Sequence, residues 1–407
     1  MTALRDPAAR IDALLAARLD AGERFFAAEA ERLARLCHRM AERFAAGGRL
    51  LALGRSPAAR SDAHHVAVEF VHPVIVGKRA LPALALTAEG GSLARQVELL
   101  AAPGDLAIAF EAGDPEMAAA LALAGERGCL TIATGDAPGD LVHAGAEWAF
   151  APEVADPFVR QELIETLYHV LWELVHVFFE HRGLLAGRSV EARSDAGAAS
   201  FLYPFLDERE DDLDAVLDDV RRSILMKSAE IGALRTQTLT DNTAALRDAA
   251  TRLRERLDAG GTLLALGNGG SATDAMDAVA DLREPPPQWP ARRALDLTED
   301  TAVLTAVAND VGVEAIFARQ AIAHGRAGDA LLTFSTSGSS TNVLAALAEA
   351  RRRELLSVAC VGYDGGRIVA EGLADIAIVT RSEHIPRIQE AQASAWHVLR
   401  ELLEVEA

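Results

Sequence analysis

The chain has 407 residues, half of them apolar and a quarter charged, a globular composition that excludes a disordered or fibrous protein. Sixty acidic residues against forty basic ones give a formal net charge of −20. Because nucleic acids and anionic membranes are bound mainly through clustered lysine and arginine, this charge argues against both as partners. At roughly 150 residues per domain, the length indicates two or three domains.

Cysteine is scarce, and no segment resembles a targeting signal. Cys37, Cys129 and Cys360 are far apart and odd in number, which argues against a disulfide framework or a CxxC metal site and favours a reducing compartment. The N-terminus carries charges throughout, unlike a secretory signal. The most apolar long stretch, residues 163–179, contains two Glu and two His, so it predicts a buried amphipathic helix and no membrane span. We therefore expect a soluble cytoplasmic protein.

Apolar runs of strand length recur along the chain and alternate with helical stretches. After an amphipathic helix, the first half contains LLAL, ALAL, LAIAF, LTIAT and WAFAP. The second half contains LLAL, RALDL, LLTF, SVACVG and IAIVT. Nearly continuous apolar strands between helices predict a parallel sheet covered on both faces. We therefore predict an α/β protein with a doubly wound, flavodoxin-like fold in each half, preceded by N-terminal helices.

The two halves repeat one another. Residues 45–69 and 258–281 share a GG turn, the run LLALG, a polar loop and a helix that carries Asp-Ala. Three further segment pairs follow in the same order: 80–87 with 291–298, 103–110 with 327–334, and 159–171 with 386–399. Four matches in one order indicate a duplicated domain. The expected organisation is a first domain at 1–182, a linker rich in small and charged residues at 183–212, and a second domain at 213–407.

A hydroxyl-rich loop in the second half indicates an anion-binding site. The run STSGSS follows a predicted strand and precedes a predicted helix, where free amides and the helix dipole favour negative charge. An ordinary serine N-cap is the alternative, but a cap needs only one hydroxyl, and this run has five. The residues that we expect to hold a phosphate are Ser335, Thr336, Ser337 and Ser340.

A glycine-rich loop, GNGGS, follows LLAL, the first predicted strand of the same half. Glycine lets the backbone approach a ligand closely, and asparagine and serine side chains hydrogen-bond to sugar hydroxyls or phosphate. This loop is a weak signal alone and a strong one beside STSGSS. We expect Asn268, Gly269 and Ser271 to contact a phosphosugar.

These motifs carry a family resemblance. The segments LGNGGSATDA, TAVANDVG, GDALLTFSTSGSSTNV and PRIQEAQASAWHVLRELLE resemble the sedoheptulose-7-phosphate isomerase (phosphoheptose isomerase) branch of the sugar-isomerase, or SIS, domain superfamily. The resemblance covers nearly all of 213–407 and, more faintly, 10–182. It implies two tandem SIS domains and an aldose–ketose isomerase, an intramolecular oxidoreductase that acts on a sugar phosphate such as sedoheptulose 7-phosphate through an enediol.

The resemblance also implies an assembly. Family members usually have one such domain per chain and form tetramers, so a tandem chain implies a homodimer that rebuilds a four-domain assembly. Asn309 and Asp310, in a family-like NDxG turn, would contact sugar from a neighbouring copy.

In this family a His and a Glu four apart follow the first loop, and a Gln and a His eight apart lie on the last helix. These residues carry zinc in some members, and the Glu and the last His are the acid/base pair. The first half has all four types: His65, Glu69, Gln161 and His169. The resemblance thus implies a zinc site in the first half, with Glu69 and His169 catalytic. Read singly, His65 and Glu69 also fit a solvated helix surface, and His169 a core histidine.

The second half has changed two of these four positions. It carries Asp277, Asp281, Gln389 and His397, so Asp281 and His397 form a second candidate acid/base pair with a shorter carboxylate. The first half has instead lost the phosphate loop, since carboxylates occupy 111–116. These complementary losses suggest that the second half holds the phosphosugar while the first supplies metal and acid/base groups.

Two other interpretations remain open. A non-catalytic SIS protein that senses a phosphosugar or assists protein assembly would show the same decay of different parts in each half. A transferase-type SIS module, as in glucosamine-6-phosphate synthase, is disfavoured because no glutaminase domain is attached.

Overall fold

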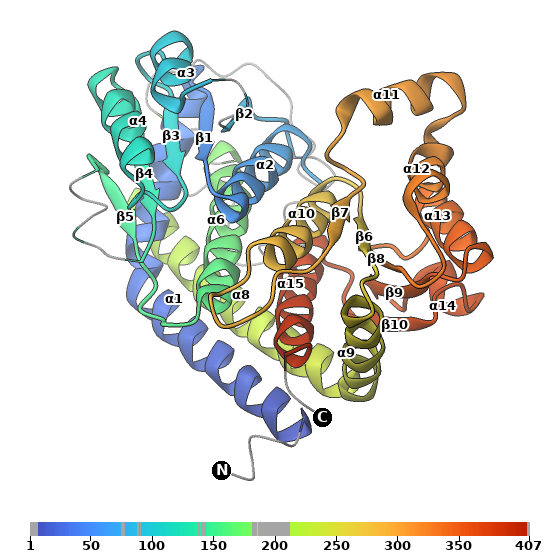
Figure 1. The fold of residues 1–407 in the computed structure, drawn as a ribbon. Coiled ribbons are helices and arrows are strands. Elements are labelled where there is room, and N and C mark those ends of the chain that lie inside the picture. The colour runs from blue at the N-terminus through green and yellow to red at the C-terminus, as the bar shows by residue number, and fades with distance from the viewer. Residues whose placement is uncertain are drawn as a thin grey trace. The chain divides into compact units, whose positions relative to one another are not determined.

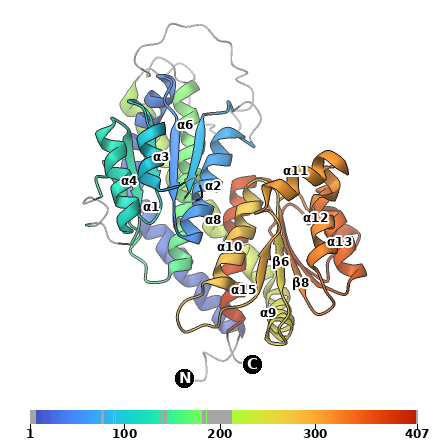
Figure 2. The same cartoon turned by 45° about the horizontal axis from the view of Figure 1, so that its top comes forward.

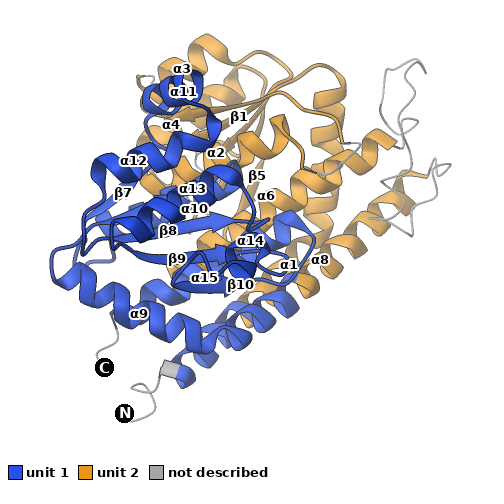
Figure 3. Cartoon of the chain, turned by 90° about the vertical axis from the view of Figure 1, so that its right-hand side faces the viewer, with its two compact units in different colours: residues 1–19, 231–407 blue, residues 20–230 orange. Residues whose placement is uncertain are grey.

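Two parallel sheets, each of five strands, form in the part of the chain that the structure, a computed structural model, describes (Figure 1). The described residues are 7–74, 78–87, 89, 91–136, 139, 144–180, 185 and 212–404. Contacts within the chain divide it into two units (Figure 3). Unit 1 takes in Met1–Leu19 and Ile231–Ala407, and unit 2 is Asp20–Glu230.

The sheet of unit 2 has the strand order β2-β1-β3-β4-β5, with every neighbouring pair parallel. Its strands are β1 Leu50–Gly54, β2 Ala83–Thr87, β3 Leu106–Ala109, β4 Leu130–Thr134 and β5 Trp148–Phe150. Side chains alternate between the two faces of a strand, and here both faces are buried. Leu50 and Ala52 belong to one hydrophobic cluster, and Leu51 and Leu53 belong to another. Burial on both faces explains why the strands read as continuous apolar runs.

Helices cover both faces of this sheet. The core around Leu50 contains residues of α2 Pro57–Val71 and α6 Pro157–Glu180, and the core around Leu51 contains residues of α3 Leu93–Leu100 and α4 Pro115–Glu126. The helix expected at 163–179 is α6, whose residues 162–178 are all buried. Among the described residues, no helix combines the length and the apolarity that crossing a membrane requires.

The sheet of unit 1 has the order β10-β9-β8-β6-β7, again all parallel. Its strands are β6 Leu263–Leu266, β7 Ala294–Asp296, β8 Ala330–Ser335, β9 Leu356–Val361 and β10 Ile376–Val379. Read from β7, this order repeats that of unit 2, and both follow the flavodoxin-like pattern. The fold class and the ten strands expected from the sequence are confirmed.

Helices also cover both faces of this second sheet. In Figure 2, α10 and α15 lie on one side of it, and α12 and α13 on the other. The helices are α9 Thr243–Asp258, α10 Gly270–Arg283, α11 Thr301–Asp310, η4 Val313–Ala315, α12 Ile316–His324, α13 Thr341–Arg352, α14 Gly366–Ala370 and α15 Ile385–Leu402.

Two long helices, α1 Pro7–Ala45 and α8 Leu213–Asp241, each contribute to both units. In α1, Leu14 belongs to the core of unit 1, whereas Leu33 belongs to the core of unit 2. In α8, Val220 belongs to the core of unit 2, whereas Ile231 packs with residues of unit 1. The expected linker lies, except for Leu185 and Asp212, outside the described residues, so the domain boundaries stay a prediction.

Candidate functional site

The GNGGS loop of unit 1 leaves the carboxyl end of β6 and enters α10. Gly267 has no room for a side chain, because an added Cβ would lie 2.0 Å from the carbonyl oxygen of Ser271. Gly269 has a φ of 59°, a left-handed conformation that favours glycine. The side-chain amides of Asn268 and Asn342 bond to each other in both directions, at 3.0 and 2.8 Å. This pair ties the loop to the first turn of α13.

The STSGSS loop follows β8, the neighbour of β6 in the sheet. Gly338 has a φ of 58°, and its amide donates to the hydroxyl of Ser335 at 3.1 Å. The hydroxyls of Ser337 and Ser340 lie 3.4 Å apart. Ser340 is the N-cap residue of α13, yet its side chain makes no capping hydrogen bond. Capping therefore does not account for this hydroxyl, and both expected phosphosugar loops lie at the carboxyl edge of one sheet.

Asn309 and Asp310 lie at the end of α11, whose residues are all at least partly exposed. Their side chains are exposed, and the amide of Asn309 donates to the carboxylate of Asp310 at 2.8 Å.

In unit 2 the corresponding loops bond to each other. Arg55 takes the place of the GNGGS side chains, and its guanidinium bonds to Asp114 at 2.8 Å and to Glu116 at 3.0 Å. The other carboxylate oxygen of Asp114 accepts from the amides of Glu116 and Met117 at the start of α4. Those amides correspond to the amides of Asn342 and Val343 at the start of α13, where the amide of Val343 donates to the side-chain oxygen of Asn342 at 2.9 Å. In unit 2 a carboxylate of the chain itself already occupies that position.

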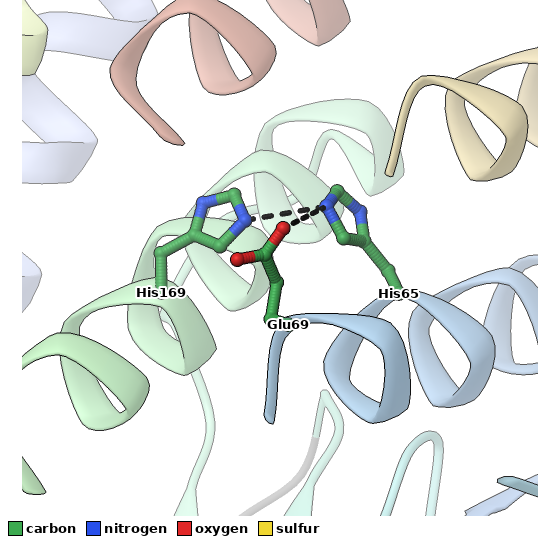
Figure 4. A group of neighbouring side chains, drawn as sticks. All are labelled: His65, Glu69 and His169. Atoms are coloured by element: carbon green, nitrogen blue, oxygen red, sulfur yellow. Dashed lines mark hydrogen bonds and ion pairs between the residues drawn. The ribbon is translucent and has the colours of Figure 1, made fainter. Parts of the chain in front are cut away.

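Unit 2 contains a group of metal-ligand side chains on two helices, α2 and α6 (Figure 4). The ligand atoms of His65, Glu69 and His169 all lie within 4.8 Å of one another, and all three residues are buried. The Nε2 atoms of the two histidines are 3.3 Å apart, and Nε2 of His65 is 3.9 Å from the Glu69 carboxylate. The solvated-surface interpretation of His65 and Glu69 is therefore wrong.

This group has the chemistry of a metal site. Burial first, and the neighbouring His169 second, hold the pKa of His65 well below its usual range, so His65 is neutral near pH 7. Neutral imidazole and carboxylate are the donors that zinc takes in catalytic sites. At bond lengths of about 2.0–2.1 Å, two nitrogens of a tetrahedral ion lie about 3.3 Å apart. The donor types and the His65–His169 spacing thus fit zinc.

Gln161 lies on α6 two turns before His169 and is half-buried. The nitrogen of its side-chain amide is buried and has no hydrogen-bond partner among the described residues. An amide oxygen can bind a metal, but the rise of about 12 Å along eight helical residues separates Gln161 from the group. Its assignment as a ligand stays a prediction.

The matching positions of unit 1 form a different arrangement. A carboxylate oxygen of Asp281 accepts a hydrogen bond from the indole of Trp396 at 2.7 Å and lies 3.8 Å from Nε2 of His397. Burial raises the pKa of Asp281, and His397, Trp396 and Arg400 offset part of that rise. Within the described part of unit 1, no three His, Cys, Asp or Glu side chains come together as they do in unit 2.

Sequence reasoning missed four residues that shape these sites: Tyr168, Trp396, Arg55 and Asn342. The hydroxyl of Tyr168 lies 3.0 Å from Nδ1 of His65. Tyr168 and Trp396 each stand directly before the last-helix histidine of their half, in the dipeptides YH and WH. The alignment of 159–171 with 386–399 pairs these two aromatic residues, but it does not show which side chains they contact.

Comparison with known proteins agrees with the motifs. A family model described as the SIS domain matches residues 228–362. The phosphoheptose isomerase of Desulfovibrio desulfuricans is 40% identical over 190 residues, which cover 46% of this chain and 90% of the relative. That of Paramagnetospirillum magneticum is 43% identical over 182 residues, which cover 42% of this chain and 91% of the relative.

A solved structure shows the fold over nearly the whole chain. The C-terminal domain of glucosamine-fructose-6-phosphate aminotransferase from Francisella tularensis has a TM-score of 0.60 and 10% identity, and the match covers 96% of this chain and 93% of that one. At that identity the likeness is one of fold alone, a tandem pair of SIS-like α/β domains. The resemblance stated from the motifs is confirmed: the chain belongs to the SIS-domain family that includes the phosphoheptose isomerases.

Proposed function

We propose that this protein is an aldose–ketose isomerase that acts on a sugar phosphate such as sedoheptulose 7-phosphate. The observation that carries isomerisation, rather than binding alone, is the buried group of His65, Glu69 and His169. A carboxylate and two imidazoles whose ligand atoms lie within 4.8 Å of one another are groups that can take and give protons.

The substrate phosphate would bind at the STSGSS loop. Hydroxyls of Ser335, Thr336, Ser337 and Ser340 would hold it together with the first amides of α13, where the helix dipole favours an anion. Asn268, Gly269 and Ser271 would contact the sugar. The crowded glycines and the Asn268–Asn342 pair support this assignment, because they hold both loops in one geometry before a ligand arrives.

The reaction would be a proton transfer through an enediol. A carboxylate removes the hydrogen on C2 of the aldose, and the C2–H electrons form the C1–C2 double bond as O1 takes up a proton. The proton on O2 is then lost and C1 is protonated, which gives the ketose. Glu69 with His169 is the better-supported pair, because an Asp281 oxygen is already engaged by the Trp396 indole. Asp281 with His397 is the other candidate.

Zinc would bind at His65, Glu69 and His169, with Gln161 as a further candidate ligand. When bound, a zinc ion would polarise the substrate carbonyl. We place the metal and acid/base groups in unit 2 and the phosphosugar loops in unit 1. We also propose a homodimer as the assembly and, from three buried free cysteines, a cytoplasmic setting.

Hydrogen exchange at the substrate would test the isomerase proposal. The protein is incubated with sedoheptulose 7-phosphate in deuterium oxide, and proton NMR follows deuterium entering the C1 and C2 positions. We expect exchange in the wild type and a loss of at least 100-fold in Glu69→Gln, which keeps the side-chain shape but removes the base. Glu98→Gln, at an exposed position on α3, is the matched control.

A non-catalytic phosphosugar-sensing or assembly protein is the second candidate. The Arg55–Asp114 and Trp396–Asp281 bonds favour this second candidate. In each bond, a residue of the chain itself occupies a group that an active isomerase would use to bind or deprotonate its substrate. Tight sugar-phosphate binding without any exchange would select this second function and end the isomerase proposal.

A further inference from the structure

An aromatic residue stands directly before the last-helix histidine in each unit, and each reaches the helix that follows the first loop. In unit 2, the hydroxyl of Tyr168 lies 3.0 Å from Nδ1 of His65 on α2. In unit 1, the indole of Trp396 donates to the carboxylate of Asp281 on α10 at 2.7 Å. In both units, therefore, the residue directly before the last-helix histidine contacts a candidate site residue. Tyr168 does so through its phenol, and Trp396 does so through its indole.

The two aromatic residues match what they contact. An indole N–H can only donate, which suits the carboxylate of Asp281. A phenol oxygen also accepts, which suits a ring N–H of His65. Trp396 contacts Asp281, which corresponds to Glu69, whereas Tyr168 contacts His65, one helical turn before Glu69. In unit 2 the aromatic contact is therefore made to the imidazole of the candidate metal group.

We propose that Tyr168 is a positioning residue that fixes the tautomer of His65, with the proton on Nδ1 and the Nε2 lone pair directed at a metal ion. The hydroxyl oxygen accepts from Nδ1, and Nε2 faces His169 at 3.3 Å and Glu69 at 3.9 Å. A histidine that binds a metal through one nitrogen is oriented by the hydrogen bond that its other nitrogen makes. The metal part of this inference rests on the proposed function.

Aromatic packing holds the ring of Tyr168 next to His65. Its ring packs edge-on against His65, with centroids 5.3 Å apart, and against Phe110, with centroids 6.0 Å apart. Tyr168 and His65 are both 2% exposed, so bulk water does not take the place of the phenol oxygen. Without that oxygen, the population of the His65 tautomer protonated at Nε2 increases, because Nε2 can then donate to Glu69 or His169. That proton would occupy the atom that the metal needs.

The test compares Tyr168→Phe with the wild type, both in the metal-free state. Tyr168→Phe removes one oxygen and keeps the ring, and Tyr363→Phe is the matched control because it removes a hydroxyl in unit 1. Long-range ¹H–¹⁵N correlation spectra of histidine-labelled protein report the tautomer of each imidazole, and loss of a signal in His65→Asn identifies His65. Zinc affinity is measured separately, by competition with a chromophoric chelator.

We expect His65 to carry its proton on Nδ1 in the wild type and in Tyr363→Phe, and to shift toward Nε2 in Tyr168→Phe. Zinc should bind 10- to 100-fold more weakly in Tyr168→Phe alone, the usual effect of losing such a partner. An Nε2–H tautomer in the wild type, or an unchanged tautomer in Tyr168→Phe, would overturn the inference.

The two readouts separate this inference from the metal proposal. Equal zinc affinity in the wild type and Tyr168→Phe would overturn the role of Tyr168 while leaving the metal site standing. No zinc binding in a wild type with the Nδ1–H tautomer would support that role and remove zinc from the proposed function.

Discussion

The guanidinium of Arg55 bonds to the carboxylate of Asp114 at 2.8 Å, across the two loops of unit 2 that correspond to GNGGS and STSGSS. Asp114 also caps α4, so the amides at that helix start already have an anionic partner. A phosphate would have to displace a carboxylate that is part of the chain.

We predict one sugar-phosphate site per chain. Calorimetric titration with sedoheptulose 7-phosphate should saturate at one ligand per chain, and Arg55→Ala should bind with unchanged affinity. Ser337→Ala in unit 1 should weaken binding roughly 10- to 150-fold, since a hydrogen bond to a charged group contributes about 1.5–3 kcal/mol. Two equivalent sites, or lost affinity in Arg55→Ala, would contradict this assignment.

Gly338→Ala should disable the phosphate loop. Its φ of 58° and an added Cβ only 2.2 Å from the carbonyl oxygen of Gly365 oppose any side chain. We expect sugar-phosphate affinity to fall at least 10-fold and the melting temperature to drop. Gly372→Ala is the matched control, because Gly372 has the same φ of 58° but open space at its Cβ. That variant should cost only about 1–2 kcal/mol of backbone strain and keep affinity; equal affinity losses in both would refute the prediction.

Asp281→Asn should stabilise the protein at neutral pH. Burial raises the pKa of Asp281 in the folded state, so the folded carboxyl holds its proton more tightly than the unfolded one. This costs stability as the pH rises above about 3.8, the ordinary pKa, and costs nothing below it. The amide oxygen of Asn can still accept from Trp396. Urea unfolding at pH 7 should show a larger unfolding free energy for the variant, with the gap closing toward pH 4.

An opposite result would be informative. If Asp281→Asn is less stable than the wild type at pH 7, the Asp281 carboxylate is ionised in the folded protein and its surroundings stabilise that charge. Asp281 would then be a stronger candidate for the catalytic base.

A buried ion pair between Lys227 and Glu173 joins α8 to α6 within unit 2. Both side chains are at most 8% exposed, so removing one leaves a buried charge without its counter-ion. Lys227→Met should cost about 3–5 kcal/mol of unfolding free energy, and Lys227→Met with Glu173→Leu should recover most of it. Arg35→Ala, which breaks an exposed pair with Glu31, is the control and should change little. A full-size loss in the double variant would contradict the ion-pair explanation.

The sequence predicted the ten strands that the described residues form, because burial on both sheet faces makes most of them continuous apolar runs, although β7 ends at the partly buried Asp296. It also predicted that His65, Glu69 and His169 belong together, through a resemblance and an i,i+4 spacing. It did not predict Arg55–Asp114 or Tyr168–His65, because pairs 59 and 103 residues apart depend on tertiary packing. Nor did it predict that α1 and α8 serve both units, since an amphipathic face does not specify which core it joins.

That sharing of helices bears on how the chain can be divided. A fragment that begins at Leu213 would lack Ile11, Leu14 and Leu15, and its core would be left with an open apolar surface. The other fragment, ending at Glu180, would lack the α8 residues around Val220. Each piece would carry the segment that completes the other. Mixed in solution, the two pieces should therefore reassemble by fragment complementation, and neither should fold well alone.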